Sequence, residues 1–204
     1  MSRFTDRDRE RIRTRLIEAG RELFEQFGFD RTRIRDVTEA VGIGTSTFYQ
    51  FFDSKEALYV EVLLAERAEL DERIEAAVGA VDTPREEVRA FLSTLFAEVR
   101  TNPLISTLIV DGELRELQDR IAAVEDDGKP IAPHAHDSDL PYASRWAETE
   151  SFRYDDPQLI NGLFVALVFT ARARNAPIGA DSDAAAERVE DALIETIVDG
   201  LFTN

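Results

Sequence analysis

Residues 42–55, GIGTSTFYQFFDSK, carry side chains that could contact a nucleic acid. A glycine turn leads into an expected short helix, whose start and next turn bear hydroxyl and amide groups: Thr45, Ser46, Thr47, Tyr49 and Gln50. Hydroxyls and the free N–H groups of a helix start can donate to phosphates or to base edges. The segment has four aromatic residues but only one basic residue, Lys55. It therefore predicts short-range polar contacts and little positive charge.

A second group of potential ligands is HAHDSD, which contains His134, His136, Asp137 and Asp139. Two imidazoles and two carboxylates can bind a divalent metal. His-x-His pairs also occur in metal-dependent hydrolases, but on the strand ends of barrels, and this chain lacks the strands and the length for a barrel. Because the pair lies in residues 125–141, a polar stretch with three prolines, we interpret it as an exposed loop. We therefore predict no metal site here, and metal binding by this loop is the alternative interpretation.

The charge of the chain is unevenly placed. The 204 residues have a formal net charge of -17, yet residues 1–60 hold 11 basic and 11 acidic residues. Only this N-terminal part would not strongly repel a polyanion. Just two of the 24 basic residues are lysines. Such a surface fits a halophilic protein, because concentrated salt screens the repulsion; an ordinary acidic protein from a GC-rich genome is the alternative.

The composition excludes several classes of protein. A hydrophobic content of 44% is enough for a core, and the absence of cysteine excludes disulfides and thiolate metal sites. No apolar run reaches the roughly 18 residues of a membrane helix. The N-terminus lacks the apolar region of a secretory signal. We expect a soluble, cytoplasmic protein.

Hydrophobic periodicity predicts helices nearly throughout and no strand of any length. Thr5 and Asp8 are typical of a capped helix start, and Gly28 is expected to end the first helix in the left-handed conformation. The fold class is therefore all-α with about nine helices, at roughly 5–27, 33–41, 45–52, 54–77, 84–99, 103–111, 114–124, 157–173 and 183–202, and a further short helix around 142–150 would be a tenth.

The last two helices predict a homodimer. Residues 157–173 are apolar on too many faces for a helix that is half exposed to water, and residues 183–202 carry one apolar stripe. An isologous dimer would supply cover from beyond the chain. In such a dimer the short helix that follows Gly42 would occur twice, about one DNA turn or more apart. If this helix contacts DNA, the binding site is predicted to be palindromic.

The two short helices that flank Gly42 have the geometry of a helix-turn-helix. Gly42 can adopt the left-handed conformation that a Cβ would resist. Ile43 and Phe48 are expected to fill the angle between the helices. Thr38 lies where the helices approach most closely, so its side chain has to be small.

Across residues 11–58 the sequence resembles the tetracycline-repressor (TetR) family of transcriptional regulators. The resemblance is carried by GIGTSTFYQFFDSKEAL, where the family shows a Gly-Val turn, Thr-Leu-Tyr, an aromatic residue and Ser-Lys-Glu-x-Leu, and by the preceding LFEQFGFDRTRIRDV. It implies a three-helix DNA-binding head in residues 1–53, with the motif at about 33–52. Residues 54–204 would form an effector-binding and dimerisation domain.

The resemblance also implies roles for the side chains that follow the turn. Thr45 and Ser46 would face the bases. Thr47 and Tyr49 would hold phosphates. Gln50 could read a base edge, because Gln pairs bidentately with adenine.

Three basic residues receive roles from the same resemblance. Lys55 would grip a phosphate, and Arg33 and Arg35 would reach the backbone or a guanine. The family often has a basic residue at the positions of Thr45 and Gln50. This chain has therefore removed charge from the recognition helix and placed some on the helix before it.

The implied function is a dimeric repressor that a small molecule releases from a palindromic operator in double-stranded DNA. Aromatic side chains that could line an apolar pocket favour a largely apolar effector, with ordinary core as the other interpretation: Phe91, Phe96, Trp146 and Phe164. No cofactor is expected. The chain is not expected to be an enzyme, because no nucleophile–base pair supports one. The alternatives are an architectural DNA-binding protein without an effector and a metal-dependent enzyme that uses the His134 and His136 loop.

Overall fold

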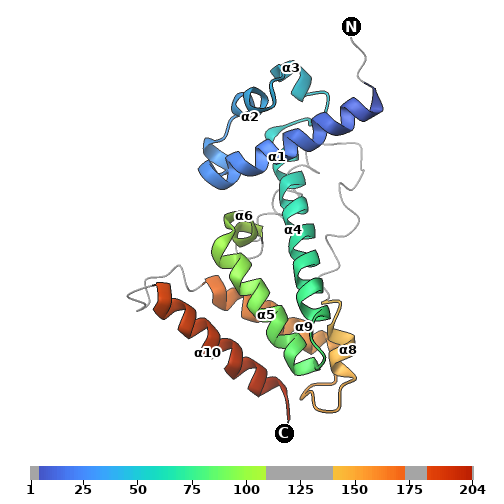
Figure 1. The fold of residues 1–204 in the computed structure, drawn as a ribbon, viewed down its shortest axis with the longest axis vertical. Helices are drawn as coiled ribbons and strands as arrows, with labels where there is room; N and C mark the ends of the chain where they lie inside the picture. Colours follow the sequence, from blue (N-terminus) through green and yellow to red (C-terminus); the bar gives the residue numbers. More distant parts are fainter. Residues whose placement is uncertain (1–4, 109–139, 173–182, 204) are drawn as a thin grey trace. The chain divides into compact units, whose positions relative to one another are not determined.

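The computed structural model describes residues 5–108, 140–172 and 183–203. Within them the chain forms nine helices and only an isolated β-bridge, which confirms the prediction of an all-α fold with about nine helices (Figure 1). None of the described helices is both long and apolar enough to span a membrane. The contacts group the described residues into two compact units, unit 1 at 5–68 and 102–108 and unit 2 at 69–101, 140–172 and 183–203.

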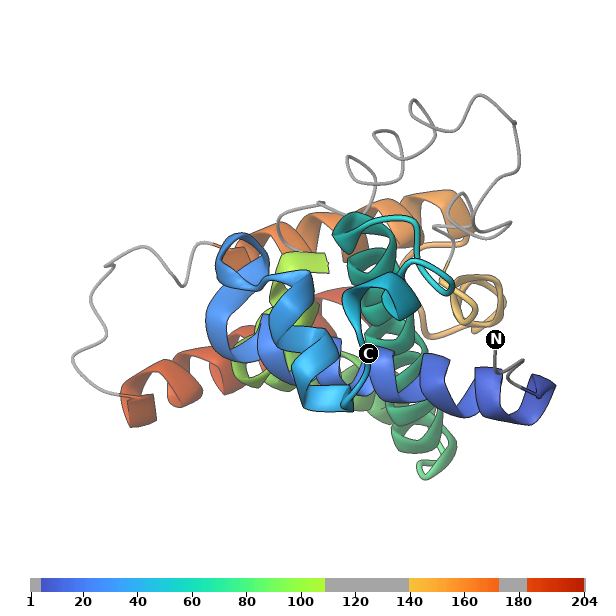
Figure 2. The ribbon, with the colours of Figure 1, turned by 90° about the horizontal axis from the view of Figure 1, so that it is seen from above.

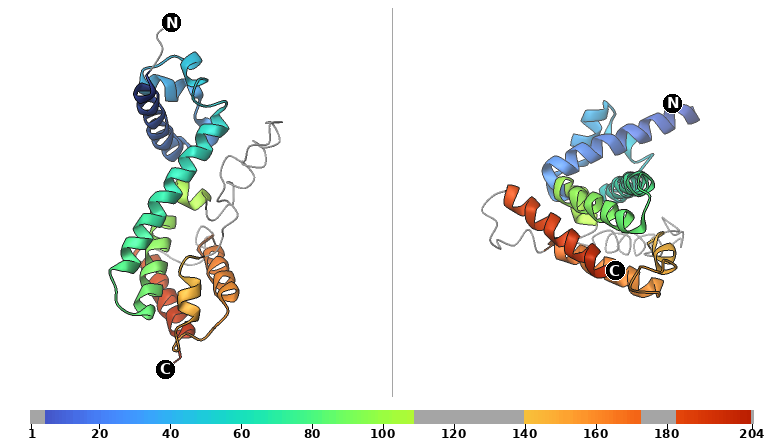
Figure 3. Two further views of the ribbon diagram at one scale, coloured as in Figure 1. Left: turned by 90° about the vertical axis from the view of Figure 1, so that its right-hand side faces the viewer. Right: turned by 60° about the horizontal axis from the view of Figure 1, so that its bottom comes forward.

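Unit 1 is a small helical head. In Figure 3 its first three helices gather around the beginning of the long fourth helix. The contacts also bring the one-turn sixth helix against the first. The bounds are α1 (Asp6–Arg31), α2 (Ile34–Val41), α3 (Thr45–Phe48), α4 (Lys55–Gly79, which enters unit 1 as far as Ala68) and α6 (Pro103–Ser106).

The ends of α1 follow the sequence prediction only in part. The Thr5 hydroxyl accepts from the Asp8 N–H at 3.2 Å, which confirms the predicted cap, and the hydrogen bonds from Thr5 lower the pKa of Asp8. Gly28 has a positive φ of 76°, as predicted, but its ψ of 168° is extended. The left-handed helix end predicted there is therefore wrong. The chain resumes a short helical turn to Arg31, and the Thr32 N–H bonds back to the Gly28 carbonyl at 3.3 Å.

α1 and α4 touch closely in the core of unit 1. Leu16 and Leu58 are fully buried. A Cβ added to Gly20 would lie 3.2 Å from Leu58 Cδ2 and 3.3 Å from Val62 Cγ2. Glycine is therefore required at this crossing by space and not by backbone conformation.

A buried carboxylate links three helices of unit 1. Glu66 on α4 is 1% exposed. One of its oxygens lies 2.5 Å from Arg21 Nε on α1, and the other accepts from Asn102 Nδ2 at 2.6 Å. The Asn102 side chain in turn caps α6 by accepting from the N–H groups of Leu104 and Ile105. Glu66 thus brings a charged group, held by partners on α1 and at the start of α6, into the core of unit 1.

Unit 2 packs the remaining helices around a second core. α5 runs antiparallel to α10, and α8 lies against α9 (Figures 1 and 3). The segment between α8 and α9 is joined to the C-terminal end of the unit by the bridge between Phe152 and Phe202. Besides the second part of α4, the helices are α5 (Pro84–Thr101), α8 (Ala143–Ala147), α9 (Pro157–Arg172) and α10 (Asp183–Leu201).

Ion pairs join α5 to α10. Arg89 Nε and Nη2 donate to the two oxygens of Glu195 at 2.7 and 2.9 Å. The hydrogen bond from Arg89 lowers the pKa of Glu195, and the same bond raises the pKa of Arg89. Further pairs link Arg85 with Asp199 and Arg100 with Glu190. Because the pairs between exposed groups are screened by salt, they align the helices more than they stabilise them.

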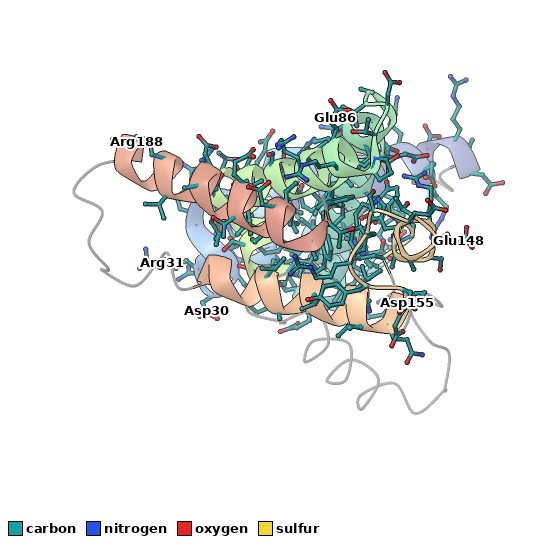
Figure 4. All side chains as sticks on the ribbon, turned by 90° about the horizontal axis from the view of Figure 1, so that it is seen from below. Asp30, Arg31, Glu86, Glu148, Asp155 and Arg188 are labelled. Carbon is teal, nitrogen blue, oxygen red and sulfur yellow. The ribbon has the colours of Figure 1, made fainter. Side chains whose placement is uncertain are left out.

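The surface carries the acidic excess of the sequence. Figure 4 shows the labelled side chains Glu86, Glu148 and Asp155 projecting away from the helices and loop that bear them, and all three are exposed.

The observed α9 and α10 agree closely with the predicted ranges 157–173 and 183–202. The predicted helix at 114–124 lies outside the described residues, as does all of the predicted loop at 125–141 except its last two residues.

Candidate nucleic-acid interface

The turn between α2 and α3 is built on one glycine. Gly42 has φ 76° and ψ 35°, which is the left-handed conformation that the sequence predicts. The N–H groups of Gly42 and Ile43 both donate to the Thr38 carbonyl, at 2.9 and 3.0 Å. These bonds close the end of α2 and redirect the chain into α3 within three residues, which is the geometry of a helix-turn-helix (Figure 2).

Apolar packing fixes α3 against the head. Phe48 is fully buried, as predicted, and Phe52 is 5% exposed, so both are core residues. Thr38 is 2% exposed, and its hydroxyl donates back to the Arg35 carbonyl at 3.0 Å, so the small residue predicted at the helix crossing is present there. Ile43 is half-buried. The regular part of α3 ends at Phe48, and an irregular turn replaces the helix predicted to residue 52.

The predicted DNA-contacting residues on α3 and its following turn share one exposed end of the head. Thr45, Ser46 and Gln50 are exposed, and Thr47 is half-buried. Tyr49 is 54% exposed although its ring meets the Phe48 ring edge-on at 5.4 Å between centroids. No side chain caps the start of α3. These hydroxyl, amide and phenol groups are therefore accessible to a partner.

The two arginines at the start of α2 are exposed but constrained. The Arg33 N–H donates to the Asp36 carboxylate at 3.0 Å, which leaves the Arg33 side chain outside this contact. Arg35 Nε donates to Glu39 at 2.7 Å, and this hydrogen bond raises the pKa of Arg35. Arg35 thus faces a partner with its charge balanced by Glu39. A phosphate would have to compete with that carboxylate.

Lys55 has a structural role that the sequence does not reveal. Its ammonium donates to the carbonyls of Phe29 and Thr32 at 2.8 and 3.1 Å and lies 4.0 Å from the centroid of the Phe29 ring. A Lys ammonium has three donors, so two of them are used inside the head. Lys55 ties the first residue of α4 to the end of α1.

A basic residue that the sequence pattern does not reveal lies beside the turn that follows α3. Arg9 on α1 donates from Nη2 to the Gln50 carbonyl at 3.2 Å, and its guanidinium lies 5.1 Å from the centroid of the Phe51 ring. Similarly, Arg15 donates to the Val41 carbonyl at 2.9 Å. Ten basic residues occur in the first 35, and no spacing rule distinguishes the two that reach the helix-turn-helix.

Three of the four predicted pocket residues meet in unit 2, but they pack against one another. The Trp146 ring lies 5.1 Å from that of Phe164, and the Phe91 ring lies 5.4 Å from Phe164 and 6.0 Å from Trp146 between centroids. All three side chains are buried, as is Phe96. Trp146 Nε1 donates to Glu87 at 2.8 Å. The cluster is a densely packed core, and a ligand would have to part or flank these rings.

The predicted histidine loop, with His134 and His136, lies outside the described residues. Among the residues that are described, no group of three His, Asp or Glu side chains could hold a metal ion.

The arrangement of α2, turn and α3 on a three-helix head defines a helix-turn-helix protein. The model of the family described as "Bacterial regulatory proteins, tetR family" matches residues 16–62. An uncharacterized HTH-type transcriptional regulator of Mycobacterium tuberculosis is 27% identical over 116 residues, which cover 54% of this chain and 57% of that protein. RutR, an HTH-type transcriptional regulator of Escherichia coli, is 40% identical over 48 residues, which cover 24% of this chain and 23% of RutR.

The likeness extends to the whole fold. The crystal structure of RolR in complex with resorcinol superposes with a TM-score of 0.64 and 18% identity, covering 98% of this chain and 92% of RolR. The match over residues 16–62 confirms the predicted resemblance to the tetR family of regulatory proteins, a family of transcriptional regulators and not of enzymes. The matches span between about a quarter and little more than half the length of the curated relatives.

Proposed function

We propose that the protein is a dimeric, cytoplasmic transcriptional repressor that leaves a palindromic operator when a small, largely apolar effector binds. The observation that carries the proposal is that the polar side chains of α3 are exposed directly after the turn at Gly42. This turn and α3 lie within residues 16–62, the region that matches the family model. The similarity to RutR, a transcriptional regulator, and to KstR2 of Rhodococcus jostii, a transcriptional repressor that is 39% identical over 51 residues, supports the same role. In this proposal residues 1–53 bind DNA and residues 54–204 bind the effector and the second subunit.

The polar groups of α3 are suited to contact with DNA. We assign base edges to Thr45, Ser46 and Gln50, and phosphates to Thr47 and Tyr49. The head region is close to neutral, whereas the remaining sequence carries the net charge of -17, so DNA would approach the head. Short-range hydrogen bonds from hydroxyls lose less strength in salt than charge–charge contacts do.

Exposed apolar side chains on α9 and α10 support the dimer. Val189 and Leu193 are 65% and 38% exposed and lie four residues apart, so they share one face of α10. Leu159 on α9 is 46% exposed. A second copy of the chain would cover this face.

A Leu193→Glu variant is expected to shift the protein from dimer to monomer in analytical ultracentrifugation, because it places a charge in the proposed apolar interface. Glu195→Gln, on the same helix, should leave the dimer intact. A dimeric Leu193→Glu would contradict the assignment.

The effector is proposed to bind near the aromatic cluster of Phe91, Trp146 and Phe164. RolR, which shares the fold, was crystallised with the aromatic compound resorcinol. A thermal-shift screen of small aromatic compounds would identify candidates. A compound that raises the melting temperature of the protein and leaves its DNA affinity unchanged would contradict release by that compound.

The DNA-binding function is tested by selecting fragments from a random library with purified protein at several salt concentrations. The expected result is a short palindromic sequence and a footprint with twofold symmetry. A broad footprint without sequence preference would favour the architectural alternative. No retained DNA at any salt concentration would overturn the proposal.

A Tyr49→Phe variant is expected to bind the selected operator about fivefold more weakly for each bound subunit, because each subunit loses one phosphate hydrogen bond worth about 1 kcal/mol. Thr47→Ala should act in the same direction. The dependence of affinity on salt should not change, because neither substitution removes a charge. Fluorescence anisotropy measures both quantities.

The matched control is Tyr154→Phe, which removes the same hydroxyl from unit 2. Its operator affinity should equal that of the wild type. The wild type itself should show a salt slope well below the value of about 10 that is known for a binder with many phosphate contacts. A slope near that value would contradict the assignment of short-range contacts to α3.

A further inference from the structure

Arg9 occupies a distinctive position next to the candidate interface. Its guanidinium lies over the Phe51 ring at 5.1 Å and donates from one nitrogen to the Gln50 carbonyl at 3.2 Å. Both partners belong to the irregular turn that follows α3, and Arg9 itself is exposed on α1. The side chain is therefore held in one orientation by a neutral ring and a neutral carbonyl.

The charge of Arg9 is not balanced by an acid. Arg11, Arg13 and Arg35 are paired with Asp8, Glu61 and Glu39. For Arg9 no carboxylate partner is found within the residues that the structure describes. A guanidinium has five N–H donors, and the Gln50 carbonyl uses one of them. A neutral side chain with one N–H donor could make the same hydrogen bond to the Gln50 carbonyl. The positive charge of Arg9 is therefore not needed for this contact.

Two of the other basic residues near the interface are less available. Lys55 donates two of its three N–H groups to carbonyls inside the head, and Arg35 is bound to Glu39. α3 contains no basic residue. Arg9 thus brings to the turn after α3 a cation that is held in place and has no carboxylate partner among the described residues, and it comes from α1.

We propose that Arg9 is a DNA phosphate-contacting residue, with Phe51 as the platform that holds its guanidinium. Stacking on a ring leaves the edge of the guanidinium free, and that edge matches two oxygens of a phosphate. The ring also restricts the side chain before DNA arrives, so less rotamer freedom is lost on binding. This inference rests on the proposed DNA-binding function and adds a residue and a charge to it.

The test uses the full-length protein and the operator that the wild type selects. Arg9→Gln is expected to weaken binding about tenfold at 0.15 M salt and to reduce the salt slope by about 0.9 for each bound subunit. Arg9→Lys, which keeps the charge but lacks the planar fork, should keep the slope and lose a few-fold in affinity. Phe51→Leu should also weaken binding a few-fold at an unchanged slope, because the platform is lost and the charge remains.

Arg11→Gln is the matched control. It removes the same charge from the same helix, but two residues further on, where a helix points to another side. Equal affinities and slopes for Arg9→Gln and Arg11→Gln would overturn the role of Arg9, even if the wild type binds its operator tightly. A wild type that selects no DNA would overturn the proposed function, and the role of Arg9 with it. Circular dichroism melting curves of each variant show whether a loss of binding reflects loss of folding, in which case Arg9→Lys and Phe51→Leu decide.

Discussion

A Glu66→Ala variant is expected to lose about 3 kcal/mol of its free energy of unfolding. Breaking a buried ion pair by removing one partner typically costs about 3–5 kcal/mol, because the other charge stays behind. The lower end applies here because the Arg21 side chain is 35% exposed and can be partly hydrated. Asn102 Nδ2 also loses its acceptor, which removes the fixed link between α4 and the cap of α6.

Urea unfolding measures this loss of free energy, and two further variants serve as comparisons. Glu72→Ala removes an exposed carboxylate from the same helix and should change stability by no more than about 0.5 kcal/mol. Glu66→Gln keeps an acceptor for Asn102 but not the charge for Arg21, so it should fall between the two. If Glu66→Ala were as stable as Glu72→Ala, the buried carboxylate would have no structural role.

The helix starts could be predicted from sequence because they depend on contacts a few residues apart. The Ser54 hydroxyl accepts from the Ala57 N–H at 3.0 Å, and Thr83 bonds Glu86 in both directions. Asn102 caps the helix that begins at Pro103. Each of these contacts lies within one helical turn, so the residue types alone specify it. The end of the first helix was harder to predict. A glycine with positive φ at position 28 is compatible both with a helix end and with a kink before a further helical turn to Arg31, and the structure has the kink.

Contacts between distant residues could not be predicted in the same way. Arg9 and Gln50 are 41 positions apart, and Glu66 and Asn102 are 36 apart. Their side chains are common surface types, and only the crossing of the helices brings them together. For this reason the exposed groups of α3, which follow a recognisable turn, were predicted, while the arginine beside them was not.

The aromatic residues of unit 2 illustrate a different limit. The sequence predicts that Phe91, Trp146 and Phe164 lie in an apolar interior, and the structure brings them together. Periodicity specifies which face of a helix is buried. It does not distinguish a ring that lines a cavity from one that fills it, because both have the same pattern.

Replacing Lys55 by methionine is expected to weaken operator binding more than tenfold and to lower the free energy of unfolding by about 2 kcal/mol. The methionine side chain keeps most of the apolar stem but leaves the carbonyls of Phe29 and Thr32 without their charged donor. A hydrogen bond to a charged group contributes about 1.5–3 kcal/mol, and partial exposure reduces the sum of the two. The segment between α1 and α2 would loosen, and α2 and α3 would lose their fixed position on the head.

The salt dependence separates this structural role from the phosphate contact that the family resemblance implies. If Lys55 acts by holding the segment between α1 and α2, Lys55→Met lowers both stability and affinity but changes the salt slope by much less than the 0.9 or so of a lost phosphate contact. Arg31→Met, which removes an exposed charge from the last turn of α1, should have the smaller effect on stability. A stable Lys55→Met protein whose slope falls by about 0.9 per subunit would instead make Lys55 a phosphate anchor, because the third ammonium donor would then be the one that matters.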